Sequence, residues 1–478
     1  MQENPRQFIK RLTSFSVGPF IAAIFGFITV PVTTYLVSPA DFGKSAMYTM
    51  GYSISTLFIF LGLDQAFVRE FNEYKDKSEL FWNSLIIPLI FSILIGGFYV
   101  VFYKAISILM FDSVEQYIII ILAVSLPFAV LDRFNMLVLR MEEKAKIYSL
   151  FSILNKLLAL LVLIPYLIFI DRSFKGIINA TFINLIIICI VESYFVKHVW
   201  KRKFIINKAM LIKMFKFGLP LVPATIIGWF LSSMDRLALR QWSTFNEIGI
   251  YSAAFKIVAI LTLIQQAFTT FWTPTAFRWH KEGIENSTYM KVSKLLLTIM
   301  VLVFSSIVLF KDIIIKLLSS NYISASKSIP FSLFFPIMYT ISETTTLGIL
   351  FSRKTSYNII ISVIAAISNY IGNYLLVPKF GAMGASISTG IAYIIFFWCR
   401  TLISRKLWFK FEIRDYLINT ILLLLLSIMS ITINNFLINL IIIIIILFAN
   451  KSSIIEIFNY IKKMIGNHYT NLNSCDEG

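Results

Sequence analysis

Two lysines lie in the middle of segments that are otherwise strongly apolar. Lys156 interrupts the run LFSILNKLLALLVLI, and Lys256 interrupts the run IYSAAFKIVAILTLI. A charged side chain at membrane depth is costly, so such a side chain is usually either paired or functional. Because cations neutralise anionic groups, we expect Lys156 and Lys256 to bind an anionic ligand, with Arg236 as the third cation.

Amide side chains accompany these cations. Asn155 stands beside Lys156, and Asn369 and Asn373 are one helical turn apart in the segment 357–377. Amides can both donate and accept hydrogen bonds, which makes these three residues candidates for binding a polar ligand. Asn369 and Asn373 have an alternative role, because amides also join neighbouring membrane helices by hydrogen bonds.

Carboxylates at similar depth could bind a coupling cation. Glu343 and Asp64 are the candidate cation-binding groups. Two further carboxylates are each followed by an arginine, in Asp132-Arg133 and Asp235-Arg236. These adjacent pairs are either part of a charge network or only neutralise each other and fix helix packing. Glu192 is expected near an interface, in contact with solvent.

The composition identifies the elements that must position these side chains. Of the 478 residues, 58% are hydrophobic and only 14% are charged, against about 25% charged residues in soluble domains. The mean hydropathy is +0.79. These values exclude a soluble enzyme. The three cysteines are too few and too scattered for a disulfide framework or a zinc site.

Apolar segments long enough to cross a bilayer as helices, about 20 residues each, recur along the chain. We predict an all-α integral membrane protein with about 14 transmembrane helices. The predicted spans are 14–37, 45–68, 80–103, 116–139, 148–170, 174–196, 217–239, 247–272, 288–310, 328–350, 357–377, 384–404, 413–433 and 435–449.

The basic residues indicate the topology. If the N-terminus and every second loop are cytoplasmic, those segments hold most of the 43 Lys and Arg residues, including the group from Arg400 to Arg414. This is the positive-inside pattern, and it places both termini in the cytoplasm. The net charge of +18 is therefore a topology signal, and we expect no nucleic-acid partner.

An internal duplication divides the predicted spans. Asp41-Phe-Gly43 matches Glu247-Ile-Gly249, and Gln65-Ala-Phe67 matches Gln266-Ala-Phe268, at an offset of roughly 200 residues. Each repeat has six spans, which predicts two parallel six-helix bundles related by pseudo-two-fold symmetry. The predicted domains are the bundles 1–196 and 217–410, the basic linker 197–216, two extra helices in 411–449, and a cytoplasmic amphipathic tail, 450–478.

Several segments resemble bacterial polysaccharide flippases. The similar segments are LVSPADFG at 36–43, GLDQAFVR at 62–69, SMDRL at 233–237 and the stretch from KTSY at 354–357 to VPKFGAMGA at 377–385. The chain resembles the O-antigen and capsule repeat-unit flippases of the multidrug/oligosaccharidyl-lipid/polysaccharide exporter superfamily, over roughly residues 8–410.

The resemblance implies a transporter in the bacterial inner membrane, not an enzyme. Its substrate would be an undecaprenyl-diphosphate-linked oligosaccharide, moved from the cytoplasmic to the periplasmic leaflet for O-antigen, lipopolysaccharide or capsule synthesis. With such a substrate, the cations Lys156, Lys256 and Arg236 would bind the diphosphate. The amides of Asn155, Asn369 and Asn373 would bind the sugar. The expected partners are membrane lipids and two proteins, a polysaccharide polymerase and a chain-length regulator. No cofactor is expected. The sequence has no G-x-x-x-x-G-K-[ST] motif, so coupling would be to a proton or sodium gradient.

Two rival functions are compatible with a polytopic membrane protein. A cation-coupled multidrug exporter of the same superfamily would need an acidic interior for its cationic cargo, whereas Lys156, Lys256 and Arg236 make this one locally basic. A membrane-embedded polymerase or transferase would need a sizeable outer loop and a catalytic motif, and the sequence shows neither.

Overall fold

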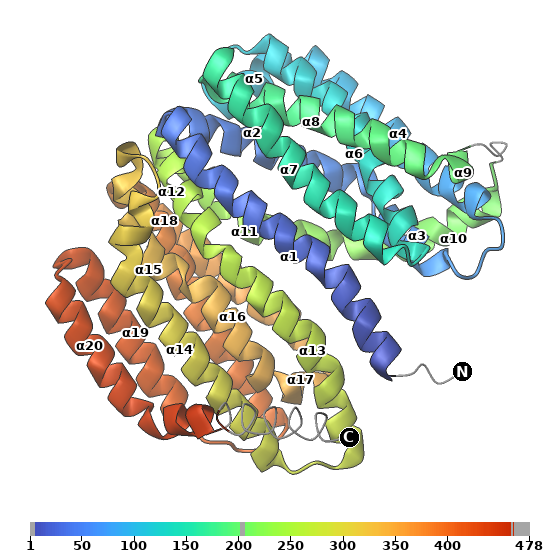
Figure 1. The fold of residues 1–478 in the computed structure, drawn as a ribbon. Coiled ribbons are helices and arrows are strands. Elements are labelled where there is room, and N and C mark those ends of the chain that lie inside the picture. Colours follow the sequence, from blue (N-terminus) through green and yellow to red (C-terminus); the bar gives the residue numbers. More distant parts are fainter. Residues whose placement is uncertain (1–4, 201–205, 460–461, 463–478) are drawn as a thin grey trace, which may run out of the picture. The chain divides into compact units, whose positions relative to one another are not determined.

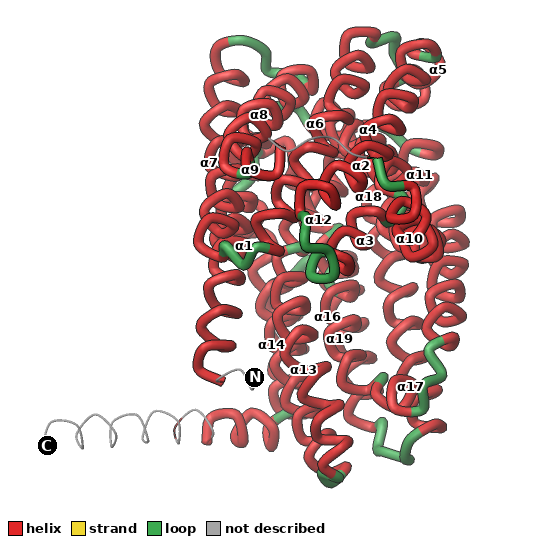
Figure 2. The backbone as a smooth tube through the Cα atoms, turned by 90° about the vertical axis from the view of Figure 1, so that its right-hand side faces the viewer, coloured by secondary structure: helices red, strands yellow, loops and turns green. Residues whose placement is uncertain are grey.

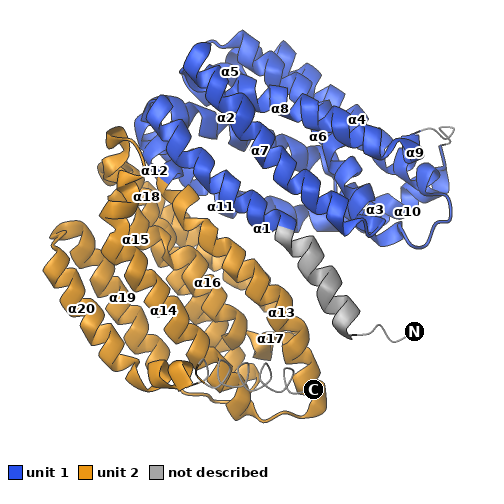
Figure 3. Cartoon of the chain, in the orientation of Figure 1, with its two compact units in different colours: residues 1–253 blue, residues 254–478 orange. Residues whose placement is uncertain are grey.

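The computed structural model describes residues 5–200, 206–459 and 462, with side chains described from residue 18 onward. The described chain consists of helices and their connections, without a strand (Figures 1 and 2). It separates into two compact units, residues 1–253 (unit 1) and 254–478 (unit 2) (Figure 3). The all-helical prediction is confirmed.

Unit 1 is built around α6, the helix that carries Asp132 and Arg133. More than half (56%) of the most apolar window of α6 is buried, and the helix packs against α4 and α8. The helices of unit 1 are α1 (Pro5–Leu36), α2 (Pro39–Phe60), α3 (Leu63–Glu70), α4 (Lys77–Val101), α5 (Tyr103–Phe111), α6 (Gln116–Met141), α7 (Ala145–Phe169), α8 (Phe174–Phe195), α9 (Lys197–Trp200), α10 (Lys208–Gly218), the 3₁₀ turn η1 (Leu219–Leu221), α11 (Val222–Trp242) and α12 (Phe245–Val258), whose last turn belongs to unit 2.

Unit 2 places α16, the helix of Glu343, among α13, α14 and α18. Its helices are α13 (Ile260–Glu282), α14 (Asn286–Lys316), the 3₁₀ segment η2 (Ser320–Lys327), α15 (Ile329–Ser332), α16 (Phe334–Thr345), α17 (Leu347–Phe351), α18 (Ser356–Leu407), α19 (Arg414–Thr432) and α20 (Phe436–Ala449).

Ten helices of the described chain are long and apolar enough to cross a membrane, or up to twelve if each of two bent pairs forms one span. The predicted number of fourteen is therefore not confirmed. The predicted span 328–350 is divided among α15, α16 and α17. The predicted spans 357–377 and 384–404 correspond to the two arms of α18, which are two helices separated by a kink at Gly381, where φ is 51°. That conformation suits glycine because it has no side chain.

The second predicted span is broken near its end. Ser38 caps α2 by accepting a hydrogen bond from the amide of Asp41, and the helix ends at Leu61, where φ is 49°. Gly62 follows with φ of 73°, and α3 then leaves at 52° to α2. This bend gives α3 its own direction, with Asp64 in its first turn buried.

The segment between the predicted bundles is attached to unit 1. The amide of Asn207, before α10, donates to the side chain of Asn83 at 2.8 Å, and its side chain donates to Glu79 at 2.9 Å. Lys213 pairs with the buried Glu70 of α3. The predicted domain division stays a prediction. Of the predicted tail, Lys451–Asn459 forms a helix bent by 69° from α20, and residues 460–461 and 463–478 lie outside the described part.

Two glycines from matching positions of the duplication meet within unit 1. A Cβ added to Gly43 on α2 would lie 2.0 Å from the carbonyl oxygen of Phe245, and one added to Gly249 on α12 would lie 1.8 Å from that of Pro39. Each glycine thus meets the carbonyl four residues before the other. This reciprocal contact is what a local two-fold axis between the two segments would produce.

We expect Gly249→Ala to destabilise the protein by about 1–3 kcal/mol, the usual cost of overpacking a close contact. The added methyl group must push α12 away from the Pro39 carbonyl. Thermal unfolding of the purified protein in detergent measures the effect. Gly228→Ala on α11 is the matched control, because nothing lies within 4 Å of its added Cβ, and it should cause no loss. Equal melting temperatures for the two variants would contradict the prediction.

Candidate functional site

The adjacent residues Asp132 and Arg133 on α6 have different partners. Arg133 reaches α3, where its Nε and Nη2 donate to one carboxylate oxygen of Asp64 at 3.2 and 2.6 Å. Gln65 donates to the same oxygen at 3.0 Å. Asp64 is only 7% exposed, so the arginine neutralises a carboxylate that is buried inside unit 1.

Asp132 lies beside Glu192 of α8, with the two carboxyl groups in hydrogen-bonding range of each other. Glu192 is 1% exposed. The expectation that Glu192 contacts solvent is therefore wrong. The close packing of α6 against α8 places this end of α8 inside unit 1, which the apolar character of the segment alone does not reveal.

Lys156 and Asn155 occupy the middle of α7. The Lys156 side chain is exposed and is close enough to Asp132 to interact with it electrostatically. Asn155 accepts a hydrogen bond from the amide of Asn184 on α8 at 2.9 Å. The structure therefore places Lys156 near the Asp132 carboxylate of α6, and the side-chain carbonyl of Asn155 joins two helices.

The α11–α12 hairpin holds Asp235 and Arg236. The Tyr251 hydroxyl donates to Asp235 at 2.5 Å. Arg236 points to hydroxyl and carbonyl oxygens instead, with its Nε 3.5 Å from the Ser252 hydroxyl and its Nη1 3.4 Å from the Ser232 carbonyl. Lys256, in the last turn of α12, is exposed.

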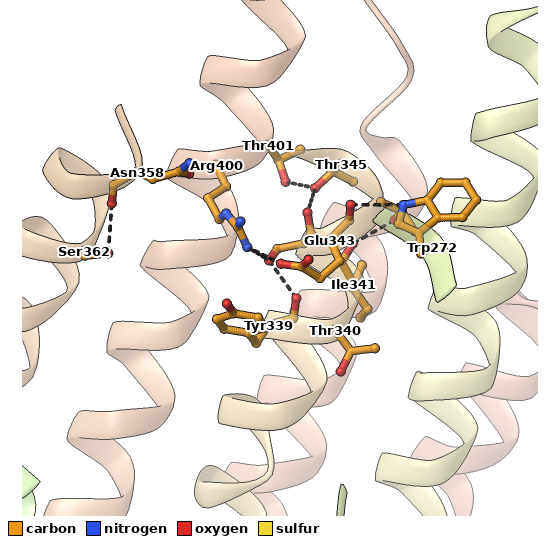
Figure 4. A network of polar contacts seen from close by, with 12 residues as sticks. Trp272, Tyr339, Thr340, Ile341, Glu343, Thr345, Asn358, Ser362, Arg400 and Thr401 are labelled. Atoms are coloured by element: carbon orange, nitrogen blue, oxygen red, sulfur yellow. Dashed lines mark hydrogen bonds and ion pairs between the residues drawn. The ribbon is translucent and has the colours of Figure 1, made fainter. Parts of the chain in front are cut away.

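Unit 2 contains a buried ion pair between Glu343 of α16 and Arg400 of α18 (Figure 4). Nη1 of Arg400 donates to the Glu343 carboxylate at 2.9 Å and to the Ser342 hydroxyl at 2.7 Å. The guanidinium carbon lies 5.4 and 5.1 Å from the ring centres of Tyr339 and Phe396. A cation at Glu343 would have to compete with this guanidinium.

Hydrogen bonds hold the surrounding backbone in place. The indole nitrogen of Trp272 on α13 donates to the Glu343 carbonyl at 3.2 Å, and the Thr345 and Thr401 hydroxyls are 2.8 Å apart (Figure 4). Arg400 is a residue that the sequence reasoning missed, because it was assigned to a cytoplasmic loop. In the structure it lies within α18 and is 8% exposed. Because position 400 falls inside the predicted span 384–404, the sequence could have indicated that Arg400 is within the membrane.

Asn369 and Asn373 are buried in α18. The Asn369 amide donates to the Thr389 hydroxyl at 3.0 Å, across the break at Gly381, and Asn373 donates to Asn369 at 3.0 Å. The bond from Asn369 to Thr389 joins the two arms of α18, and the bond from Asn373 orients Asn369 within the first arm. The geometry favours the helix-joining role of the two amides over contact with a substrate.

The accessible charges at these positions are mostly positive. Four of the carboxylate residues, namely Asp64, Glu192, Asp235 and Glu343, are buried. Asp132 is half-buried, and its Oδ1 is shielded from solvent. By contrast, Lys156 and Lys256 are exposed, and Arg236 is half-buried. Among the predicted site residues, the cationic side chains are therefore more accessible to a ligand than the carboxylates.

A family profile and two known proteins match this sequence. The profile described as polysaccharide biosynthesis protein matches residues 8–280, more than half of the chain. An uncharacterized membrane protein, MJ1068, of Methanocaldococcus jannaschii is 22% identical over 81% of this chain and 82% of its own. The probable low-salt glycan biosynthesis flippase Agl15 of Haloferax volcanii is 23% identical over 38% of this chain and 39% of its own.

Two kinds of solved transporter share the fold. The lipid II flippase MurJ, in an inward closed conformation, has a TM-score of 0.70 at 16% identity, covering 94% of this chain and 99% of its own. An inward-facing multidrug resistance transporter of the MATE family, in the MOP superfamily, has a TM-score of 0.59 at 16% identity, covering 82% and 94%. At these identities the similarity establishes the fold.

Proposed function

The chain belongs to the polysaccharide biosynthesis protein family, and on that premise we propose that it moves an undecaprenyl-diphosphate-linked oligosaccharide from the cytoplasmic to the periplasmic leaflet. It is a multi-pass membrane transporter and not an enzyme. The polymer that this repeat unit serves would be O-antigen, capsule or a related surface polysaccharide.

The charge distribution is the observation that carries this proposal. Lys156 and Lys256 are exposed on their helices, whereas the carboxylates of Asp64, Asp235 and Glu343 are buried. A diphosphate is an anion that needs accessible cations. The similarity to a protein described as a probable glycan biosynthesis flippase supports a lipid-linked glycan as the cargo.

A multidrug exporter is the second candidate, because the fold is shared with a MATE transporter. A cationic drug would require accessible carboxylates, since buried and paired ones are already neutralised. Glu343 is paired with Arg400, and Asp64 is paired with Arg133. The arrangement of charges therefore favours the anionic cargo over the cationic one.

The proposed mechanism is alternating access, with a proton or sodium ion as the candidate coupling ion. The candidate cations for the diphosphate are Lys156, Lys256 and Arg236, while the polyprenyl tail would stay in the lipid. The protein would lie in the bacterial inner membrane with both termini cytoplasmic, beside a polymerase and a chain-length regulator. The position of Lys156 next to Asp132 gives a physical link between anion binding and proton binding.

Deletion of the gene in its host tests the proposal directly. We expect the long surface polysaccharide to disappear on electrophoresis, and lipid-linked single repeat units to accumulate inside, because synthesis continues without translocation. Restoring the gene should restore the polymer. An unchanged polysaccharide together with new sensitivity to cationic dyes would contradict the proposal and favour the exporter.

A further inference from the structure

The carboxyl pair of Asp132 and Glu192 lacks hydrogen-bond donors for two of its buried atoms. Oδ1 of Asp132 and Oε2 of Glu192 are inaccessible to solvent and have no hydrogen-bond partner among the described residues. A buried acceptor without a donor is unfavourable, because it has lost its hydrogen bonds to water and gained none in the protein. Because the two carboxyl groups are in hydrogen-bonding range of each other, one proton between them would supply the missing donor.

The side chains around this pair do not supply the missing hydrogen-bond donor. Arg133 is engaged with Asp64, and the side-chain amide of Asn135 on α6 donates to the Ser193 hydroxyl beside Glu192 at 2.9 Å. The remaining ionisable groups that face the pair electrostatically are Tyr52 on α2, Lys156 on α7 and Cys189 on α8. Of these three, only Lys156 is a cation.

We propose that Asp132 and Glu192 hold a single shared proton, and that this proton is the one coupled to anion binding at Lys156. Two carboxylates in contact in a buried site cannot both ionise, because like charges repel and water is excluded. A bound metal ion would need more ligands than this pair offers. No group of three or more His, Cys, Asp and Glu side chains suited to a metal lies in the described part of the chain.

The coupling to Lys156 rests on the proposed function, whereas the shared proton does not. The ammonium of Lys156 is close enough to Asp132 to attract its carboxyl group electrostatically. A diphosphate bound to Lys156 would cancel that positive charge, so the carboxyl pair would hold its proton more tightly. By reciprocity, the protonated pair binds the diphosphate more tightly. The proton and the anion therefore bind together and do not compete. This proton sets the affinity for the diphosphate, and its movement outward with the cargo would not draw energy from an inward proton gradient.

Infrared difference spectroscopy of the full-length protein in nanodiscs, across a pH titration, tests the shared proton. We expect a carbonyl band of a protonated carboxyl group at neutral pH that is lost in Glu192→Gln and in Asp132→Asn. Glu70→Gln is the matched control, because Glu70 is 2% exposed but pairs with Lys213, and it should keep the band. The absence of the band, or its survival in both variants, would overturn the proposal. Loss of the band when sodium replaces potassium would identify a metal site instead.

Binding of farnesyl diphosphate at different pH values tests the coupling. In the wild type we expect the affinity to rise about five-fold or more as the pH falls through the titration of the pair, since allosteric couplings are typically of this size. In Glu192→Gln only the titration of the probe itself should remain. A band without any diphosphate binding would refute the proposed function alone. Binding with the same pH dependence in wild type and variant would refute the coupling alone.

Discussion

Arg400→Met should cost about 3–5 kcal/mol in the free energy of unfolding, because removing one partner of a buried ion pair leaves the other charge uncompensated. Both Arg400 and Glu343 are 8% exposed, so water cannot replace the lost guanidinium. The substitution also removes the donor to the Ser342 hydroxyl. Unfolding of the purified protein in detergent, followed by heat or denaturant, measures the loss.

The double variant Glu343→Gln with Arg400→Met tests whether the loss of stability comes from the uncompensated charge. It should recover most of the lost stability, because replacing both charges by groups of similar volume is often neutral. Arg172→Ala is the matched control, since Arg172 is an exposed arginine in the connection before α8 and surface substitutions usually change stability by at most about 0.5 kcal/mol. If Arg400→Met is as stable as this control, the ion pair contributes nothing.

Helix positions followed closely from the sequence for three continuous spans of unit 1. The predictions 116–139, 148–170 and 174–196 correspond to α6, α7 and α8, each within three residues at either end. These helices are long apolar runs between polar connections, so hydropathy alone defines them. The boundaries of α2 and α3 were missed because a left-handed Leu61, rather than a proline or a charge, ends α2.

The partners of the charged residues could not be predicted in the same way. The sequence shows that Asp132 and Glu343 lie within spans, but a partner is chosen by the rotation and depth of two helices that are distant in sequence. Arg400 is 57 residues from Glu343, and Glu192 reaches Asp132 only because α8 packs on α6. Adjacent charges such as Asp132-Arg133 pointed to a local pair, whereas neighbours on a helix face directions about 100° apart.

Lys156→Ala should weaken the binding of farnesyl diphosphate about ten- to a hundredfold, because a hydrogen bond to a charged group contributes about 1.5–3 kcal/mol. Lys156 is exposed on α7, so its ammonium group is available to a ligand. Isothermal titration of the detergent-purified protein at fixed pH and ionic strength measures the affinity. Lys156→Arg should retain most of it, since the positive charge is kept.

Lys104→Ala provides the control for this substitution, because Lys104 is an equally exposed lysine on α5, outside the predicted anion site. Its removal changes the net charge by the same amount, so any loss specific to Lys156 reflects position and not overall charge. Lys156→Ala should also reduce the amount of long surface polysaccharide when it replaces the wild-type gene, and Lys104→Ala should not. Equal affinities for the two variants would show that Lys156 does not contact the diphosphate, whatever the cargo of the transporter.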